Sequence, residues 1–471
     1  MAVSTQRVLL NPREHLAYGQ DFHTAGLMEH CGLTLLKKRE GEYHWPHPDP
    51  ELVITQNPDD LSDANFVAGM GNKVAVVAHV HCRWDYYTED QKNIVHKTLL
   101  ASTAGVVPAQ FHKQEMEREF PHLPWYVAAN GVRTDLFRPS TQKERDEFKY
   151  SHLISADTKL VGFAGRIESA KGIQVLKKIC ARIAAEPFVL FVQFPAWQEV
   201  REKAKAWART EQFVQEIRAL NPRKVIVWGD HHPRLNNRPV RFFDVFLTPS
   251  LSEVQPLVVL EALVSGVPVV ATDATPFYAE LRKEMPALEP SSMQIAPLDE
   301  RFSQGATARE STLTDFEVTS LSQDLIDKIK NVGIYGYKER EQLSTQMILA
   351  GFAEASMNAR FALIYDDVVE RLRVKLQGVH SGGVYPLTLA YVDIAPTDVG
   401  VIRLLRDGVA VRIASAENPD IRTELLSTLN GQLRRDEQPN QFWFEVCQDP
   451  KRRQLELLSE SEGAHLRHDE H

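Results

Sequence analysis

The chain has 471 residues, a length that predicts two or three domains with cores large enough to be stable without disulfides or structural metals. Hydrophobic residues make up 43% and charged residues 25% of it, values typical of a soluble globular protein. The formal net charge of −9 argues against general attraction to nucleic acid or to an anionic membrane, although it leaves a local basic patch open.

The four cysteines lie far apart in the sequence, at Cys31, Cys82, Cys180 and Cys447. Because none of them forms a CxxC pair, the sequence indicates neither a zinc site nor a disulfide framework, and a reducing cytoplasm fits best. The N-terminus lacks the long apolar core of a signal peptide, and the chain has no run of 18 apolar residues. We therefore expect no membrane-spanning segment.

Residues 1–139 have the pattern of an alternating α/β unit. We expect strands at 8–10, 51–55, 74–78, 104–107 and 126–128, and helices ending near 31 and spanning 91–100 and 109–119. The run 74–78 is continuously apolar, which is typical of a buried parallel strand. A polar linker with a surface helix is expected over 139–158.

A second α/β unit follows and is clearer. We expect strands at 159–164, 188–193, 225–229, 244–248 and 267–271, and helices at 173–185, 197–219 and 257–265, the last ended by Gly266. This alternation predicts a doubly wound parallel sheet. Residues 285–320 look irregular, and 343–372 look helical. In the extension 373–471 we expect strands at 385–392 and 409–413, a helix at 422–433 and a frayed tail.

The segment 248–272 carries the strongest chemical signal. A strand ends at Thr248, a loop carries Glu253, and a helix begins near Leu257, with Glu261 about one turn into it. The N–H groups at the start of a helix favour a negatively charged group. Two acceptor carboxylates beside an anion site suit a ligand with both phosphates and hydroxyls, such as a sugar nucleotide. Solvated charges at a helix start explain the spacing alone equally well.

The surrounding residues add a family resemblance. The segment resembles the signature of two glutamates separated by seven residues in retaining glycosyltransferases of the GT-B fold, the bacterial family 4 type, also called glycosyltransferase group 1. The matching residues are Pro249, Ser250, Glu253, Pro256, Leu257, Leu260, Glu261, Ala262 and 266–269. The resemblance implies that Glu253 binds donor-sugar hydroxyls and that Glu261 binds the ribose. It also implies that backbone amides over Gln255, Pro256 and Leu257 meet the diphosphate or the sugar.

One departure lies inside this signature. Val254 and Gln255 replace the more usual glycine and an aromatic residue or leucine, which leaves the identity of the donor sugar open.

The loop after the strand 159–164 carries Gly165, Arg166, Lys171 and Gly172. Two cations near a helix N-terminus can neutralise a leaving diphosphate without a metal. The string alone is also consistent with a plain surface loop. Its position ahead of Glu253 resembles the family's diphosphate-binding arginine and lysine, so we assign Arg166 and Lys171 to catalysis and Gly165 to donor binding. We expect no metal and no cofactor besides the donor substrate.

His79 and His81 follow the apolar run 74–78. In the family, a histidine after such a strand contacts the donor sugar; His79 matches that position best by count, with His81 a close rival. A satisfied pair of loop histidines is the structural alternative. The spacing of the pair matches no metal motif.

Three further segments resemble the family more weakly. Residues 130–139, from Asn130 to Pro139, resemble its boundary between two domains. Residues 18–20 resemble a glycine loop near the donor phosphate, although only Gly19 is present. Residues 352–372, with Tyr365, resemble the terminal helix that crosses back onto the first domain, and ordinary amphipathic packing explains them equally well.

These observations favour an α/β protein with the GT-B fold, in which two facing Rossmann-like domains are followed by a C-terminal α/β extension. We place the acceptor-side domain at 1–139, the nucleotide-sugar domain at 140–345, the crossing helix at 346–372 and the extension at 373–471. The resemblance implies retention of the anomeric configuration, by a same-face substitution in which the departing diphosphate helps to deprotonate the acceptor. No residue of the sequence stands out as a covalent nucleophile.

The predicted activity is transfer of a hexose or pentose from a nucleotide sugar to an unidentified acceptor. A catalytically inactive nucleotide-binding or partner-binding protein of the same fold is one alternative, and an enzyme acting on modified DNA, which the acidic net charge disfavours, is another. A sugar phosphorylase of this fold would need a cofactor-bearing lysine or a phosphate site, for which we see no motif. No motif identifies the donor base, the acceptor, the oligomeric state or the role of the extension.

Overall fold

The computed structural model describes residues 6–11, 28, 30–37, 43, 50–56, 58–70, 74–194, 204–228, 239–285, 291–299, 313–380, 384–389, 402–406, 409–413, 441–446 and 455–459. Side chains are described up to residue 373, except for those of residues 204–210.

The first domain is built on a parallel sheet of six strands in the order β2-β1-β3-β4-β5-β6. The strands are β1 Arg7–Asn11, β2 Leu33–Lys37, β3 Leu52–Thr55, β4 Ala75–His79, β5 Ala104–Val107 and β6 Trp125–Val127. The helices are α2 Leu61–Gly69, α3 Glu89–Leu100 and α4 Gln110–Glu119. Every residue of β3, β4 and β5 is buried, which explains why β3 and β4 read as apolar runs in the sequence. The sequence did not predict β2 or α2.

The second domain has a parallel sheet in the order β12-β11-β10-β7-β8-β9. The strands are β7 Lys159–Ala164, β8 Phe188–Gln193, β9 Val225–Trp228, β10 Val245–Thr248, β11 Val269–Thr272 and β12 Met293–Ala296. The helices are α5 Gln142–Ser151, α6 Ile173–Arg182, α8 Ala204–Leu220, α9 Leu257–Val264, α10 Phe277–Glu284, α13 Asp315–Asn331 and α14 Tyr337–Met347. The chain reverses its direction of travel across the sheet between β7 and β10. Ligands of such sheets bind beyond the carboxyl ends of the strands at this switch point.

One expectation about the region 285–372 was wrong and another was incomplete. The stretch 285–320 contains β12 and the start of α13, where an irregular excursion was expected. The strand β12 has only four residues, and its two middle residues are half-buried, so it leaves a weak pattern. The expected helical character of 343–372 is confirmed, but the stretch is divided, because the chain takes a positive φ of 87° at Gly351 between α14 and the next helix, α15 Glu354–His380.

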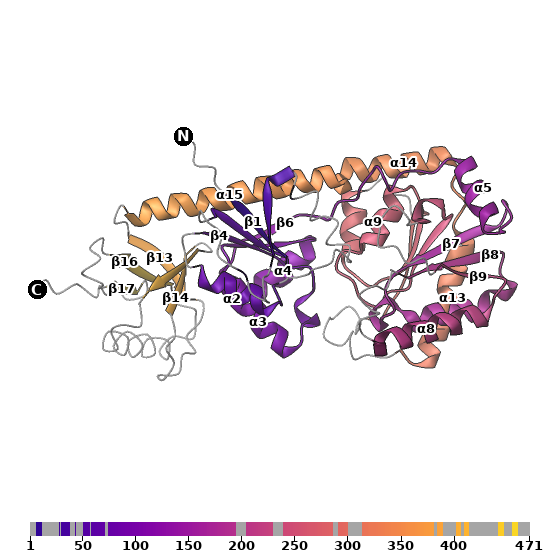
Figure 1. The fold of residues 1–471 in the computed structure, drawn as a ribbon, viewed down its shortest axis with the longest axis horizontal. Coiled ribbons are helices and arrows are strands. Elements are labelled where there is room, and N and C mark those ends of the chain that lie inside the picture. The colour runs from indigo at the N-terminus through magenta and orange to yellow at the C-terminus, as the bar shows by residue number, and fades with distance from the viewer. Residues whose placement is uncertain are drawn as a thin grey trace, which may run out of the picture.

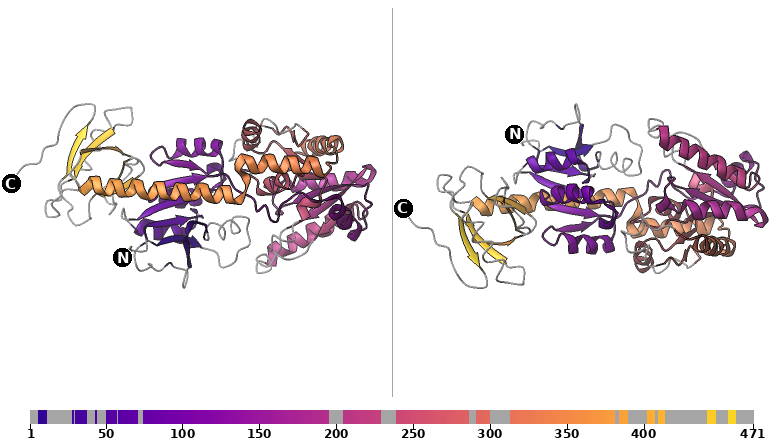
Figure 2. Two further views of the ribbon diagram at one scale, coloured as in Figure 1. Left: turned by 90° about the horizontal axis from the view of Figure 1, so that it is seen from above. Right: turned by 90° about the horizontal axis from the view of Figure 1, so that it is seen from below.

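The helix α15 returns from the second domain and lies along the first (Figure 1). Its buried side chains Met357, Phe361, Tyr365, Val368 and Leu372 join the core formed by β1, β3, β4 and β5. The views from above and below show the same crossing, with the two domains side by side beneath one helical path (Figure 2). Among the described residues, no helix combines the length and apolarity needed to cross a membrane.

The described part of the extension is an antiparallel sheet at the far end of α15 (Figure 1). Its strands, in the order β15-β14-β13-β16-β17, are β13 Val384–Leu389, β14 Ile402–Arg406, β15 Val409–Ile413, β16 Gln441–Val446 and β17 Leu455–Ser459. Both predicted strands are confirmed as β13 and β15. The predicted helix at 422–433 lies outside the described residues.

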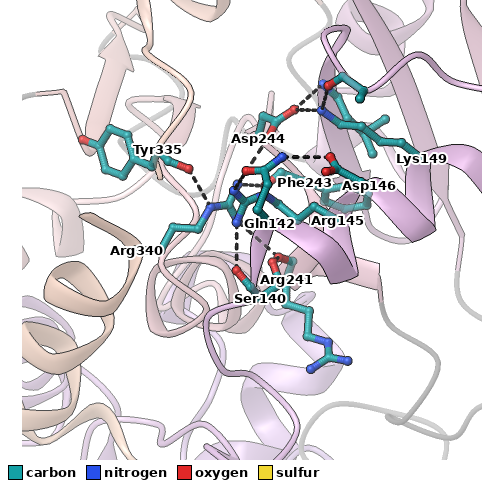
Figure 3. A network of polar contacts seen from close by, with 12 residues as sticks. Ser140, Gln142, Arg145, Asp146, Lys149, Arg241, Phe243, Asp244, Tyr335 and Arg340 are labelled. Atoms are coloured by element: carbon teal, nitrogen blue, oxygen red, sulfur yellow. Dashed lines mark hydrogen bonds and ion pairs between the residues drawn. The ribbon is translucent and has the colours of Figure 1, made fainter. Parts of the chain in front are cut away.

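A buried carboxylate, Asp244, contacts three elements of the second domain, β7, α5 and α14, directly ahead of β10 (Figure 3). Its Oδ2 accepts from the Leu160 N–H of β7 at 2.9 Å and pairs with Lys149 Nζ of α5 at 2.9 Å. Its Oδ1 lies 3.4 Å from the Arg340 Nη2 of α14. Arg340 also donates to the carbonyl oxygens of Phe243, Arg241 and Tyr335.

A third buried cation, Arg145 of α5, lies close enough that burial and its positive charge lower the pKa of Arg340 to about 9. Arg145 donates to the Ser140 carbonyl oxygen at 2.8 Å. The network therefore holds more positive than negative charge, and Asp244 is the carboxylate that compensates it.

We expect Asp244→Asn to lower the free energy of unfolding by about 3–5 kcal/mol, because it leaves buried cations without their carboxylate. Urea unfolding measures this loss. The matched control is Asp324→Asn, which breaks a partly exposed pair with Lys328 of 2.8 Å and should cost less than about 1 kcal/mol. Equal losses in the two variants would contradict the assigned role.

Candidate functional site

The loops that follow β7 and β10 meet at the switch point of the second sheet. The Leu251 N–H, after β10, donates to the Ala170 carbonyl oxygen, after β7, at 2.7 Å. Gly172 ends the β7 loop with φ 66° and starts α6. A Cβ at Gly172 would overlap the carbonyl oxygen of Pro249, so the close approach of the two loops requires glycine there.

An ion pair joins the two predicted functional loops. Lys171 Nζ lies 2.5 Å from Glu253 Oε1, with the lysine side chain 21% and the glutamate side chain 10% exposed. Ser250 Oγ donates to the same oxygen at 2.8 Å, and Thr248 Oγ1 lies 3.1 Å from Ser250 Oγ. The structure thus brings together Lys171 and Glu253, which the sequence placed 82 residues apart.

The helix α9 starts beside this pair. Its N-cap is Pro256, which has neither a side-chain acceptor nor an N–H, so the first N–H groups of α9 depend on other acceptors. Glu261 lies in the second turn and is buried. A helix start, a lysine and two carboxylates therefore share one edge of the sheet, an arrangement suited to a phosphate group with hydroxyls next to it.

Arg166 lies at the same edge of the sheet but is more exposed than Lys171. Its side chain is 50% exposed and pairs with Glu168 at 2.8 Å. The preceding Gly165 donates its N–H to the Gln193 carbonyl oxygen at 3.2 Å, which ties the end of β7 to β8. Arg166 is thus on the predicted loop, at its exposed side.

The two histidines after β4 occupy different environments. His79 is 1% exposed; its Nε2 lies 2.9 Å from the Tyr365 hydroxyl of α15, and its ring stacks on Phe361 with centroids 4.7 Å apart. Burial, together with the charge of His81, holds the pKa of His79 well below its usual value, so the ring is neutral. His81 is only partly buried. In this structure α15 covers His79, and His81 lies nearer the solvent.

Gln255 points away from the loop that carries it. Its Nε2 donates to the Pro108 carbonyl oxygen of the first domain at 3.0 Å, and its Oε1 accepts from the Asn130 N–H at 2.7 Å. The first domain therefore binds the side chain of Gln255. The family resemblance implied a role only for the backbone of this residue. The weaker candidate Gly19 lies outside the described residues.

Tyr278 and Ser252 are buried residues to which the sequence pattern assigned no role. Burial, with the nearby carboxylates Glu253 and Asp273, raises the pKa of Tyr278 well above its usual value. Among the described residues, the hydroxyls of Tyr278 and Ser252 find no hydrogen-bond partner, which is unusual for buried groups and fits a site that takes a polar ligand. The signal available was position, because Tyr278 shortly follows β11, a strand adjacent to β10.

Comparison with known sequences finds a family model that matches part of the second domain. Residues 144–285, which include the loops after β7 and β10, match the family model described as "Glycosyl transferases group 1". The matched stretch thus resembles a glycosyltransferase group 1 domain. The match covers α5 to α10 and so lies within the second domain.

Two known proteins share part of the chain. "Putative glycosyltransferase EpsF" of Bacillus subtilis is 30% identical over 168 residues, which are 35% of this chain and 39% of EpsF. "D-inositol 3-phosphate glycosyltransferase" of Corynebacterium diphtheriae is 29% identical over 153 residues, 31% of this chain and 34% of that protein. The aligned stretches thus span less than half of either relative.

Solved structures extend the likeness to both domains. Sucrose-phosphate synthase from Thermosynechococcus elongatus superposes with a TM-score of 0.56 at 15% identity, covering 78% of this chain and all of that one, 100%. Anabaena HepE superposes with a TM-score of 0.54 at 12% identity, covering 76% of this chain and 99% of that one. At these identities the likeness shows the fold, which is the predicted GT-B arrangement of two Rossmann-like domains.

We expect Gly172→Ala to lower the free energy of unfolding by about 2–4 kcal/mol, because it adds left-handed strain and a clash with Pro249. Urea unfolding is again the measurement. Gly69→Ala is the control, since nothing lies within 4 Å of its added Cβ. That change should be neutral or stabilising by up to about 1 kcal/mol. A neutral Gly172→Ala would contradict the requirement for close loop packing.

Proposed function

We propose that the chain is a glycosyltransferase that takes a sugar from a nucleotide-sugar donor and transfers it with retention of the anomeric configuration. The observation that supports this most is the Lys171–Glu253 ion pair beside the start of α9, inside the matched group 1 domain. HepE, whose fold is similar, has been solved in complex with UDP-glucose, which supports a donor of that kind here.

In this proposal the donor diphosphate lies between Lys171 and the N-terminus of α9. Lys171 moves from Glu253 to the diphosphate and neutralises the charge that develops as the bond to the sugar breaks. Glu253 is then freed to accept hydrogen bonds from donor-sugar hydroxyls, and Glu261 from the ribose. Arg166, on the exposed side of the loop, exchanges Glu168 for the phosphate.

Retention follows from a substitution on one face of the sugar, in which the departing diphosphate takes the proton of the acceptor hydroxyl. The protein contributes positioning and preorganised charge. Because Lys171 and Arg166 supply that charge, we propose that no metal is required. The acceptor, whose identity stays open, lies against the first domain.

For the histidine that faces the donor sugar we favour His81. Our first choice by sequence, His79, is covered by Phe361 and Tyr365 of α15 and would need that helix to move. His81 follows the same strand end and is partly exposed.

The departure from the family pattern at Val254 and Gln255 supports one alternative function. A catalytically inactive nucleotide-binding protein would retain Lys171 and Glu253 and bind a nucleoside diphosphate without transferring any sugar. We also propose a cytoplasmic location, because the widely spaced cysteines fit a reducing compartment.

We expect Lys171→Ala to lower turnover by on the order of 10²-fold, as for loss of one preorganised charge donor. The measurement is release of nucleoside diphosphate from a panel of UDP-, GDP-, ADP- and TDP-sugars. Lys177→Ala is the control. Lys177 of α6 pairs with Glu216 of α8 at 2.5 Å, and its side chain is 45% exposed.

Near wild-type turnover in Lys171→Ala, in a variant that unfolds at the same urea concentration as the wild type, would contradict the assignment. Tight binding of one nucleotide with no turnover of any donor would favour the inactive alternative.

A further inference from the structure

The start of α4 lies at the interface between the two domains and lacks a cap of its own. Its N-cap residue is Ala109, which has no side-chain acceptor. Ala109 is buried in the core cluster of the second domain, and Phe111 packs against the same cluster. The first N–H groups of α4 therefore face the second domain and need an acceptor from it.

Glu280, in the middle of α10, supplies that acceptor. Its Oε2 accepts from the Gln110 N–H at 3.0 Å, and its Oε1 accepts from the Phe111 N–H. A carboxylate at a helix N-terminus is favoured by both hydrogen bonding and the helix dipole. The cap of a first-domain helix is thus a side chain of the second domain, 170 residues away in the sequence.

Gln255 engages the same loop from a different element. Its Nε2 donates to the carbonyl oxygen of Pro108, which comes shortly before Gln110 and Phe111, whose N–H groups Glu280 binds. Its other bond reaches the Asn130 N–H, after β6. Gln255 is 7% exposed, and both polar atoms of its side chain are used across the interface. This accounts for a polar residue at the position where the sequence departs from the family pattern that it resembles.

A separate contact holds the chain where it crosses between the domains. The Val132 N–H donates to the Phe352 carbonyl oxygen at 2.8 Å, and the Glu354 N–H donates to the Val132 carbonyl oxygen at 2.9 Å. These bonds join the start of the linker to the start of α15. They are backbone bonds at the crossing, whereas the bonds of Glu280 and Gln255 are side-chain bonds across the interface.

We infer that Glu280 and Gln255 form an interdomain latch that holds the second domain closed on the first, and that Gln255 is a positioning residue for the donor loop. The second part rests on the proposed function. Gln255 is two residues after Glu253 and immediately before Pro256, so docking its side chain on Pro108 and Asn130 also fixes the loop of the proposed donor site. Closure of the domains and seating of that loop are then one event.

The latch is tested first on the full chain without nucleotide, by amide hydrogen exchange. We expect Glu280→Ala to speed exchange at Gln110 and Phe111 at least fivefold. We expect Gln255→Leu, which has similar volume but neither hydrogen bond, to speed exchange at the same two amides at least threefold, although Gln255 does not bond to them. Glu284→Ala, on the exposed face of α10, is the control and should leave both rates unchanged.

Unchanged exchange at Gln110 and Phe111 in Gln255→Leu would overturn the latch, since the two contacts would then be independent. If Glu280→Ala unfolds, exchange rises throughout the chain, and Gln255→Leu still decides the question.

The positioning role is tested by separating donor turnover from nucleotide binding. We expect Gln255→Leu to lower kcat/KM for the nucleotide sugar at least tenfold while Kd for the free nucleoside diphosphate, held by the second domain alone, changes less than twofold. A parallel loss of kcat/KM and of affinity for the nucleoside diphosphate would overturn the positioning role, because Gln255 would then act only within its own loop. If the wild type turns over no donor, the proposed function fails. The exchange experiment still tests the latch, because it needs no donor.

Discussion

The second domain depends on one buried carboxylate, Asp244, which compensates the charge of buried cations from α5 and α14. It also accepts a hydrogen bond from the Leu160 N–H of β7, and so it positions the start of β10 beside β7. Because β7 and β10 are the strands between which the sheet reverses, this carboxylate fixes the register at the point where a ligand is expected. Both proposed donor loops begin at the far ends of these two strands.

The candidate site follows from that register. With β7 and β10 side by side, their loops must meet, and the left-handed Gly172 lets them meet closely enough for Lys171 to reach Glu253. The ion pair is therefore a tertiary feature that holds two proposed donor-binding groups together. The second constraint is the interface, where Gln255 and Glu280 satisfy polar groups that the first domain leaves without local partners.

Much of the fold was predictable because buried parallel strands are apolar runs with clear ends, as at β4 and β7. Where burial is partial, as in β12, the pattern fades, and a single positive φ at Gly351 divides a helix whose periodicity continues. The site loops were predictable from spacing and resemblance. The direction of the Gln255 side chain was not, because its partners lie 147 and 125 residues earlier in the chain.

The central claim is that the edge formed by the β7 and β10 loops binds a nucleoside diphosphate. The most direct measurement is a thermal-shift panel of UDP, GDP, ADP and TDP. We predict that one of them raises Tm, since a ligand at 100 times its Kd adds about 2.7 kcal/mol to the stability of the folded state. We also predict that Lys171→Ala abolishes most of that shift. A chain whose Tm responds to none of the four nucleotides would contradict the account.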